Sequence, residues 1–250
     1  MIVERNQLLD ECNKLLRPEL FRDYGPNGLQ VEGRQAIGSI LSAVTASQAA
    51  VDQAIALNAD ALLVHHGVFW GKGETRLTGT LCARVKALLG ADINLLAWHL
   101  PLDAHPDLGN NAQLARLLEI RQHPQSQPTN LVAVGEFTTP LTTNELLEKL
   151  QRIFGAQASC YGGCDKPIRS IGWCTGAGGD FLEQAAQRGI DAFLTGEVSE
   201  RHYHLAQELG VCLFAGGHHA TERYGVQALG NFLAQKFSIH HQFFDQANPL

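Results

Sequence analysis

Apolar residues recur with helical spacing in some segments of the chain and with the pattern of strands in others. This predicts an alternation of helices and strands. The opening segment, up to about Leu20, has the spacing of an amphipathic helix, and the polar segment DYGPNGLQVEG (23–33) has the composition of a turn. The segment SILSAVTAS then predicts a strand, a helix follows at 48–57, and ALLV predicts the next strand. The opening helix and turn are therefore followed by strand-helix-strand order.

The same order returns in the second half of the chain. RSIGWCTGAGG predicts a strand and a turn, a helix follows near 180–188, and AFLT predicts another strand. When NADALLVHHG is aligned with GIDAFLTGEV, Asp60 matches Asp191 and His66 matches Glu197. We interpret this as an internal repeat.

The repeat continues past the next predicted strand of each half. NLLAWHLPLD places His99 and Asp103 four residues apart, and CLFAGGHHATE places His218 and Glu222 four residues apart. Each half thus ends in a histidine followed by a carboxylate at helical spacing, which makes His99 the predicted counterpart of His218.

Alternating strands and helices favour an α/β fold with mixed sheets flanked by helices. We predict two intertwined, duplicated α/β lobes with a metal cleft between them, because sites in such sheets gather at the carboxyl ends of strands. Residues 1–120 form the first repeat, 121–167 a connecting segment and 168–250 the second repeat. Within the connecting segment, Thr142 and Glu145 have capping-box spacing at the start of a helix. The end, FSIHHQFFDQANPL, predicts a final strand.

Composition narrows the class of protein. The 250 residues are 45% hydrophobic and 18% charged, enough to bury a sizeable core. A net charge of -6 makes nucleic acid an unexpected partner. We expect no membrane association, because no stretch reaches the ~18 apolar residues of a span. Six scattered cysteines suit a reducing compartment, and the pair Cys160 and Cys164 indicates an ordinary loop. We therefore expect a soluble, cytoplasmic protein.

Paired histidines carry the clearest chemistry. His65 and His66 end one apolar run, and a second pair precedes Glu222. Successive strand residues point to opposite faces, so the first pair is expected to splay toward two ions at the strand end. On a helix, either His218 or His219 is able to share a face with Glu222, and spacing does not choose between them. Imidazoles and carboxylates are the usual ligands of borderline divalent metals.

The glycine run TGAGG (175–179) follows a predicted strand and precedes a helix. Such a run is able to hold a phosphate on its backbone amides. The run matches neither G-x-G-x-x-G nor the Walker motif. A tight turn between the strand and the helix is the simpler interpretation.

Several motifs together resemble one family. HHGVFW, HLPLDAHPDLGNNAQLA, TGEVSERHYH, GHHATER and the early PNGLQVEG are similar to the dinuclear-metal-centre family known as GTP cyclohydrolase I type 2, or Nif-three-like, in its short bacterial form. The resemblance implies a homohexamer of two-lobed α/β subunits with two divalent metal ions per subunit. The implied ligands are His65, His66, Asp103, His218 and Glu222. It places His99 at the edge of the site, as a further ligand or as a donor that supports one.

Two ions ~3.5–4 Å apart would acidify a bridging water, so a metal-bridged hydroxide is the expected nucleophile. Glu197 and His204 are candidates for the general acid or base. We expect a hydrolase of a small molecule, a nucleotide or related heterocycle, with ring opening of GTP as the reaction that the family name implies. The alternative is a non-catalytic metal-binding scaffold or damaged-nucleotide-binding protein. Zinc, manganese, iron, cobalt and nickel all suit the ligand set.

Overall fold

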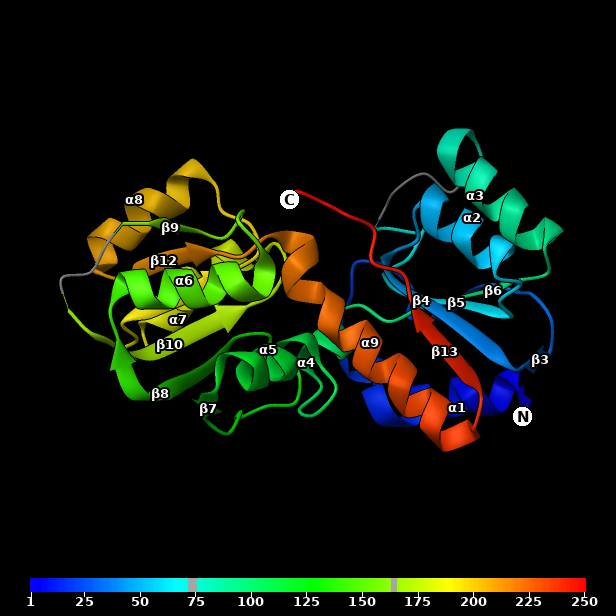
Figure 1. The fold of residues 1–250 in the computed structure, drawn as a ribbon, viewed down its shortest axis with the longest axis horizontal. Helices are drawn as coiled ribbons and strands as arrows, with labels where there is room; N and C mark the ends of the chain where they lie inside the picture. The colour runs from blue at the N-terminus through cyan, green and yellow to red at the C-terminus, as the bar shows by residue number, and fades with distance from the viewer. Residues whose placement is uncertain (72–75, 163–165) are drawn as a thin grey trace. The chain divides into compact units, whose positions relative to one another are not determined.

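The structure, a computed structural model, describes residues 1–71, 76–162 and 166–250. It divides into two compact units (Figure 1). Unit 1 comprises Met1–Leu102 and Gly225–Ala247, and unit 2 comprises Asp103–Tyr224 and Asn248–Leu250. The first two divisions fall inside helices α4 (Leu100–Ala104) and α9 (His218–Phe237), and the third lies near the end of the chain. No helix in the described part of the chain is long and apolar enough to cross a membrane.

The described residues of unit 1 form a five-stranded mixed sheet of order β13-β4-β5-β6-β2. Strands β4, β5, β6 and β13 run parallel, and β2 is antiparallel to β6. Helices α2 and α3 cover one face, and α1 with the later part of α9 covers the other (Figure 1). The elements are β1 (Val3–Glu4), α1 (Arg5–Leu16), η1 (Pro18–Leu20), β2 (Gly28–Val31), β3 (Ala36–Ile37), β4 (Ser39–Thr45), α2 (Gln48–Ala56), β5 (Ala61–His66), α3 (Gly79–Gly90), β6 (Asn94–Ala97) and β13 (His240–Phe243).

The part of unit 2 that the structure describes forms a six-stranded mixed sheet of order β7-β8-β10-β11-β12-β9. Strands β10, β11 and β12 are parallel, and the other three pair antiparallel. The elements are α5 (Asn110–Leu118), β7 (Ile120–Gln122), β8 (Ala133–Leu141), α6 (Thr143–Phe154), β9 (Ser159–Tyr161), β10 (Ile168–Cys174), η2 (Gly178–Phe181), α7 (Leu182–Ala186), β11 (Ala192–Thr195), α8 (Glu200–Leu209) and β12 (Cys212–Ala215).

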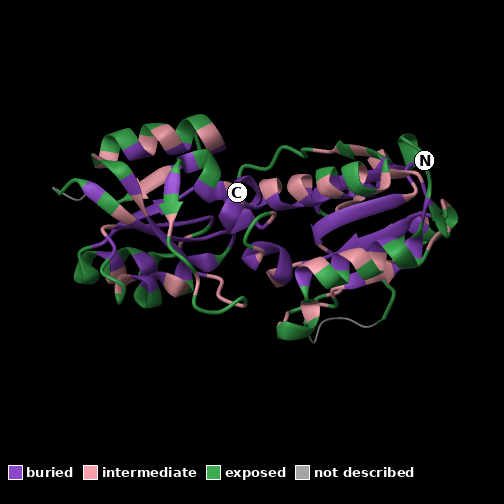
Figure 2. Ribbon diagram, turned by 90° about the horizontal axis from the view of Figure 1, so that it is seen from below, coloured by how far each residue is buried: buried purple, intermediate pink, exposed green. Residues whose placement is uncertain are grey.

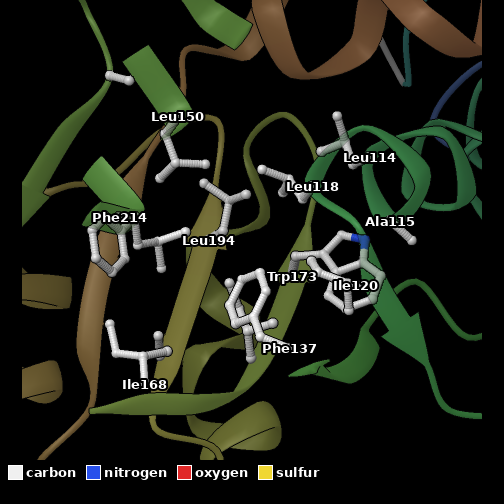
Figure 3. Close-up of a cluster of buried hydrophobic side chains, with 14 of the residues drawn as sticks. Leu114, Ala115, Leu118, Ile120, Phe137, Leu150, Ile168, Trp173, Leu194 and Phe214 are labelled. Carbon is white, nitrogen blue, oxygen red and sulfur yellow. The ribbon is translucent and has the colours of Figure 1, made fainter. Parts of the chain in front are cut away.

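Side chains from the sheet of unit 2 alternate between two cores. Trp173, Leu194 and Phe214 face α5 and α6 in a cluster without exposed members (Figure 3). Phe193 and Leu213, one residue away on the same strands, pack with α7 and α8 on the opposite face. Burial on both faces explains why these strands are continuously apolar. In Figure 2 the central strands of both units are accordingly buried, and exposed residues lie mainly on helices, loops and edge strands.

The predicted repeat is present in the hydrogen bonds at the start of the parallel strands. The carboxylate of Asp60 accepts hydrogen bonds from the backbone N–H of Gly38 (2.8 Å) and Ser39 (2.9 Å) and from the Ser39 hydroxyl (3.0 Å). Asp191 accepts from the N–H and hydroxyl of Ser170, both at 2.8 Å. The alignment of Asp60 with Asp191 is therefore confirmed.

The predicted equivalence of His99 and His218 is wrong by one residue. The carbonyl of Val64 accepts from the N–H of Trp98, and the matching carbonyl of Thr195 accepts from Gly216. His99 therefore corresponds to the residue after Gly216, and Asp103 corresponds to the residue before Glu222. The two histidine-carboxylate spacings coincide without being copies of one another.

The middle segment is not a mere connection. It supplies β7, β8, β9 and α6 to unit 2, because β8 pairs with β10 and β9 pairs with β12. The capping box of Thr142 and Glu145 at the start of α6 is confirmed. The units also have different boundaries from the predicted 1–120, 121–167 and 168–250, since pairing between strands distant in sequence decides which segments pack together.

The predicted final strand is confirmed as β13, which pairs with β4. His241 lies on it, with Nε2 2.7 Å from the Ser42 hydroxyl and Nδ1 2.9 Å from the side-chain oxygen of Asn231. This pattern fits a neutral imidazole that donates from Nδ1 and accepts at Nε2. Burial, and to a lesser degree the charge of His240, lowers the pKa of His241 to about 4.

Candidate metal site

Three imidazoles converge at the carboxyl ends of β5 and β6 in unit 1. His65 and His66 end β5, and His99 follows β6. Their ligand atoms all lie within 4.8 Å of one another, and His65 is fully buried. The ring centroids of His65 and His66 are 4.7 Å apart, and their planes are inclined by 44°. Such a group is able to hold a metal ion.

Each of these rings has a hydrogen-bond partner at Nδ1. His65 donates to the carbonyl of Trp98 (3.1 Å), His66 lies 3.1 Å from the hydroxyl of Thr45, and His99 donates to the carboxylate of Asp23 (2.7 Å). A histidine that ligates a metal usually gives its other ring nitrogen to such an acceptor, which fixes the tautomer and ring orientation. The three partners leave Nε2 as the nitrogen suited to a metal.

Asp23 is a site residue that the sequence reasoning missed. Its second oxygen accepts from the N–H of Leu100 (2.9 Å) and from the side-chain amide of Asn27 (2.9 Å). Burial alone would raise the pKa of Asp23, but the hydrogen bonds from His99 and Asn27 and the charge of His99 lower it below the ordinary value. Asp23 is therefore an ionised carboxylate that orients His99. The sequence signal for it is an aspartate at the start of the turn-forming segment 23–33.

In unit 2, a second donor group lies at the start of α9. Nε2 of His218 is 3.0 Å from Oε2 of Glu222, and Nδ1 of His218 donates to Glu197 at 2.5 Å. Two ligands each ~2.0–2.2 Å from an ion lie about this far apart. Burial would lower the pKa of His218, but its hydrogen bonds and charge interactions with Glu222 and Glu197 raise it to about 9. The structure thus pairs Glu222 with His218.

Two buried carboxylates lie near each other in unit 2. Asp103 is 7% exposed and Glu222 is 3% exposed. Asp103 accepts hydrogen bonds at one oxygen from Asn110 (2.8 Å) and Thr175 (3.1 Å). Burial, followed by the negative charges of Asp103 and Glu222, raises the pKa of the Cys174 thiol well above its usual value. Buried like charges need compensation, which a divalent cation supplies.

The glycine run lies against these donors. Gly176 has φ +61°, and a Cβ there would collide with Oε1 of Glu222 and lie 3.0 Å from Nε2 of His218. The backbone N–H of Gly176 donates to the hydroxyl of Thr221 (3.0 Å). Gly178–Phe181 then forms the short helix η2, so the run is a tight turn that permits close approach to Glu222.

The other predicted site residues lie elsewhere. His204 is exposed on α8, 3.3 Å from Glu200, and the structure gives it no place in either donor group of the described residues. Glu197, the other acid-base candidate, orients His218 and keeps 52% of its side chain exposed. Cys160 is partly buried, and burial raises its pKa. Cys164 falls outside the described residues.

The two mixed sheets and these donor groups define an α/β protein with candidate metal-binding clusters of histidine and carboxylate side chains. Residues 3–249 match the family described as Duf34/NIF3 (NGG1p interacting factor 3). The chain belongs to this family, which confirms the resemblance predicted from its motifs.

Relatives and solved structures agree with this assignment. A protein of Yersinia pestis named "GTP cyclohydrolase 1 type 2 homolog" is 50% identical over 238 residues, which cover 95% of this chain and 96% of that protein. One of Pseudomonas aeruginosa with the same name is 46% identical and covers 100% of both chains. The solved structure of protein ybgI, of unknown function, has a TM-score of 0.95 at 44% identity and covers 99% of this chain and 100% of its own. A solved protein from Thermus thermophilus has a TM-score of 0.90 at 31% identity over 99% of this chain and 100% of its own.

Proposed function

We propose that the protein is a dinuclear-metal-dependent hydrolase of a nucleotide or related heterocycle. Two divalent ions per subunit would be held by His65, His66, Asp103, His218 and Glu222, with His99 as a further ligand or supporting donor. The name of the relatives, "GTP cyclohydrolase 1 type 2 homolog", supports a nucleotide as the first substrate to test. We also propose a homohexamer in the cytoplasm.

One observation carries the proposal. Four imidazoles each have Nδ1 next to an acceptor or hydroxyl, so that Nε2 is the nitrogen presented to a ligand. Histidines with an ordinary packing role have no need of this uniform arrangement, whereas metal ligands do. The buried carboxylates of Asp103 and Glu222 supply the negative charge that a cation requires.

The ions, when bound, would activate water and stabilise negative charge on the substrate. The residues of the chain do the remaining work. Asp23 and Glu197 keep the protons on Nδ1 of His99 and His218, and so hold both rings in place. The exposed part of Glu197 is positioned to exchange a proton with solvent, which suits it to the proton transfers that a hydrolysis needs.

The test uses metal-free protein loaded in turn with manganese, zinc or iron. Each form is incubated with GTP and with a panel of nucleotides, phosphoesters and cyclic amides, and bound metal is measured by mass spectrometry. We expect two ions per chain and turnover of at least one compound, with Glu222→Gln and His218→Ala losing metal and turnover together. His123→Ala is the matched control, because this imidazole is exposed and its ion-pair contact is with Glu136.

The outcomes separate the alternatives. Tight metal retention without turnover under any metal would leave a non-catalytic metal-binding scaffold. If Glu222→Gln loses assembly and stability together with metal, the ions are structural. Size-exclusion chromatography with light scattering measures the oligomer, and a mass other than six chains contradicts the hexamer.

A further inference from the structure

Two exposed aromatic side chains flank the imidazoles of unit 1. Tyr24 is 66% exposed and Trp70 is 41% exposed. The Trp70 ring centroid lies 5.1 Å from His99 and 5.5 Å from His66, and Tyr24 lies 6.1 Å from His99. Large aromatic rings usually lose exposed surface on folding, and exposed ones are enriched at binding surfaces. Their place beside a candidate metal-ligating cluster therefore points to a ligand.

The loops that carry the two rings are fixed to each other. The indole N–H of Trp70 donates to the carbonyl of Gly67 (3.0 Å), and the N–H of Gly71 donates to the carbonyl of Tyr24. At Gly25 a Cβ would collide with the carbonyl oxygen of Phe69, so only glycine permits this approach.

Gln30 adds a further link between the same loops. Its side-chain amide donates to the carbonyl of Pro26 (2.8 Å) and accepts from the N–H of Val68 (2.8 Å). Loops fixed to each other in this way lose little conformational entropy when a ligand binds, which favours affinity.

The chemistry of the rings selects the ligand. The cavity lined by Trp70 and His99 has a volume of about 10 Å³ and is too small for an organic ring, so a ring bound beside it lies on the exposed surfaces of the two aromatic side chains. Indole and phenol rings bind flat, π-rich groups by stacking, at about 1–3 kcal/mol per base. We propose that Tyr24 and Trp70 form a stacking platform that binds the planar heterocycle of a nucleoside beside His99.

This inference rests on the proposed function and names the part of the substrate that the chain recognises. It assigns recognition to the base and not to the phosphates. The expected consequence is that nucleosides bind without a phosphate, and that sugar phosphates do not bind this platform.

Tryptophan fluorescence tests the platform directly. The chain has three tryptophans, and Trp98 and Trp173 are fully buried, so emission that responds to a bound ring comes from Trp70. Metal-free and zinc-loaded proteins are titrated with guanosine, adenosine and ribose 5-phosphate. We expect saturable quenching by the nucleosides and none by ribose 5-phosphate.

Variants extend the test through equilibrium dialysis, which needs no tryptophan signal. Tyr24→Leu and Trp70→Leu should each weaken guanosine binding by about 5–150-fold, the equivalent of ~1–3 kcal/mol. Tyr24→Phe and Trp70→Phe keep a stacking ring and should retain most of the affinity. The matched control is Tyr203→Leu, because Tyr203 is 44% exposed and its ring also lies beside a histidine, His204.

The outcomes are distinguishable from those of the hydrolase test. If guanosine does not bind, or binds equally to Tyr24→Leu, Trp70→Leu and Tyr203→Leu, the platform is refuted whatever turnover is seen. If guanosine binds through both rings but no compound is hydrolysed under any metal, the hydrolase is refuted and the platform stands.

Discussion

Replacing Gly176 with alanine should separate metal binding from folding. The new Cβ would meet the carboxylate of Glu222 and lie 3.0 Å from Nε2 of His218. The clash is with the end of a flexible side chain, so the fold is able to relieve it by rotating Glu222. That rotation moves a proposed metal ligand. We expect the variant to fold and to bind metal poorly.

The expected loss of stability follows from the backbone conformation of Gly176, and the expected loss of metal affinity follows from the contact with Glu222. A side chain at φ +61° costs about 1–2 kcal/mol relative to glycine. For a chain of this size, that cost lowers Tm by ~2–8 °C. Moving a ligand should weaken metal affinity at least as much as losing a partner of a ligand does, which is about 10–100-fold.

Gly210→Ala is the matched control. Gly210 has φ +64°, and a Cβ there has nothing within 4 Å. It should therefore reproduce the loss of stability without the loss of metal. Urea unfolding in EDTA measures the first quantity, and competition with a chromogenic chelator measures the second. Equal metal affinity in the two variants would refute the assignment of Glu222 as a ligand.

Three further predictions concern other residues. Asp23→Asn should reduce metal affinity about 10–100-fold with little change in fold, because asparagine is uncharged and has one acceptor oxygen, whereas His99, Asn27 and Leu100 donate to both oxygens of Asp23. Isothermal titration of zinc checks this, and unchanged affinity contradicts it. For His241, the unfolded chain takes up a proton near pH 6.5 and the folded chain only near pH 4, so the free energy of unfolding should fall as pH is lowered through that window. This loss of unfolding free energy is about 1–2 kcal/mol, a value reduced because the side chain is partly exposed. Urea unfolding at several pH values measures it. The loss should be smaller in His241→Gln, whereas the control His123→Gln should show the same loss as the unaltered chain. Asp191→Ala should lower the free energy of unfolding by ~2–4 kcal/mol, because backbone and hydroxyl donors at the start of β10 lose their acceptor; a loss below ~0.5 kcal/mol in thermal unfolding would contradict that reading.

The structural repeat shows how far a local pattern can be trusted. The match of Asp60 with Asp191 held because both aspartates make the same hydrogen bonds at the start of a parallel strand. The match of His99 with His218 failed because a spacing of four residues recurs by chance. Such a spacing does not show which residues occupy equivalent positions in the hydrogen bonding of the two sheets.

The order of strands and helices and the placing of histidines and acids just after strands were readable from the sequence, since both depend on periodicity over a few residues. Tertiary structure decided the rest. The partner of His99 is 76 residues away at Asp23, and the middle segment joins a sheet whose parallel strands come later in the chain. The pairing of His218 with Glu222, and the need for glycine at position 176, depend on which atoms meet in space. Hydrogen bonds and close contacts between distant segments follow from strand pairing and packing, and neither is encoded in the spacing of neighbouring residues.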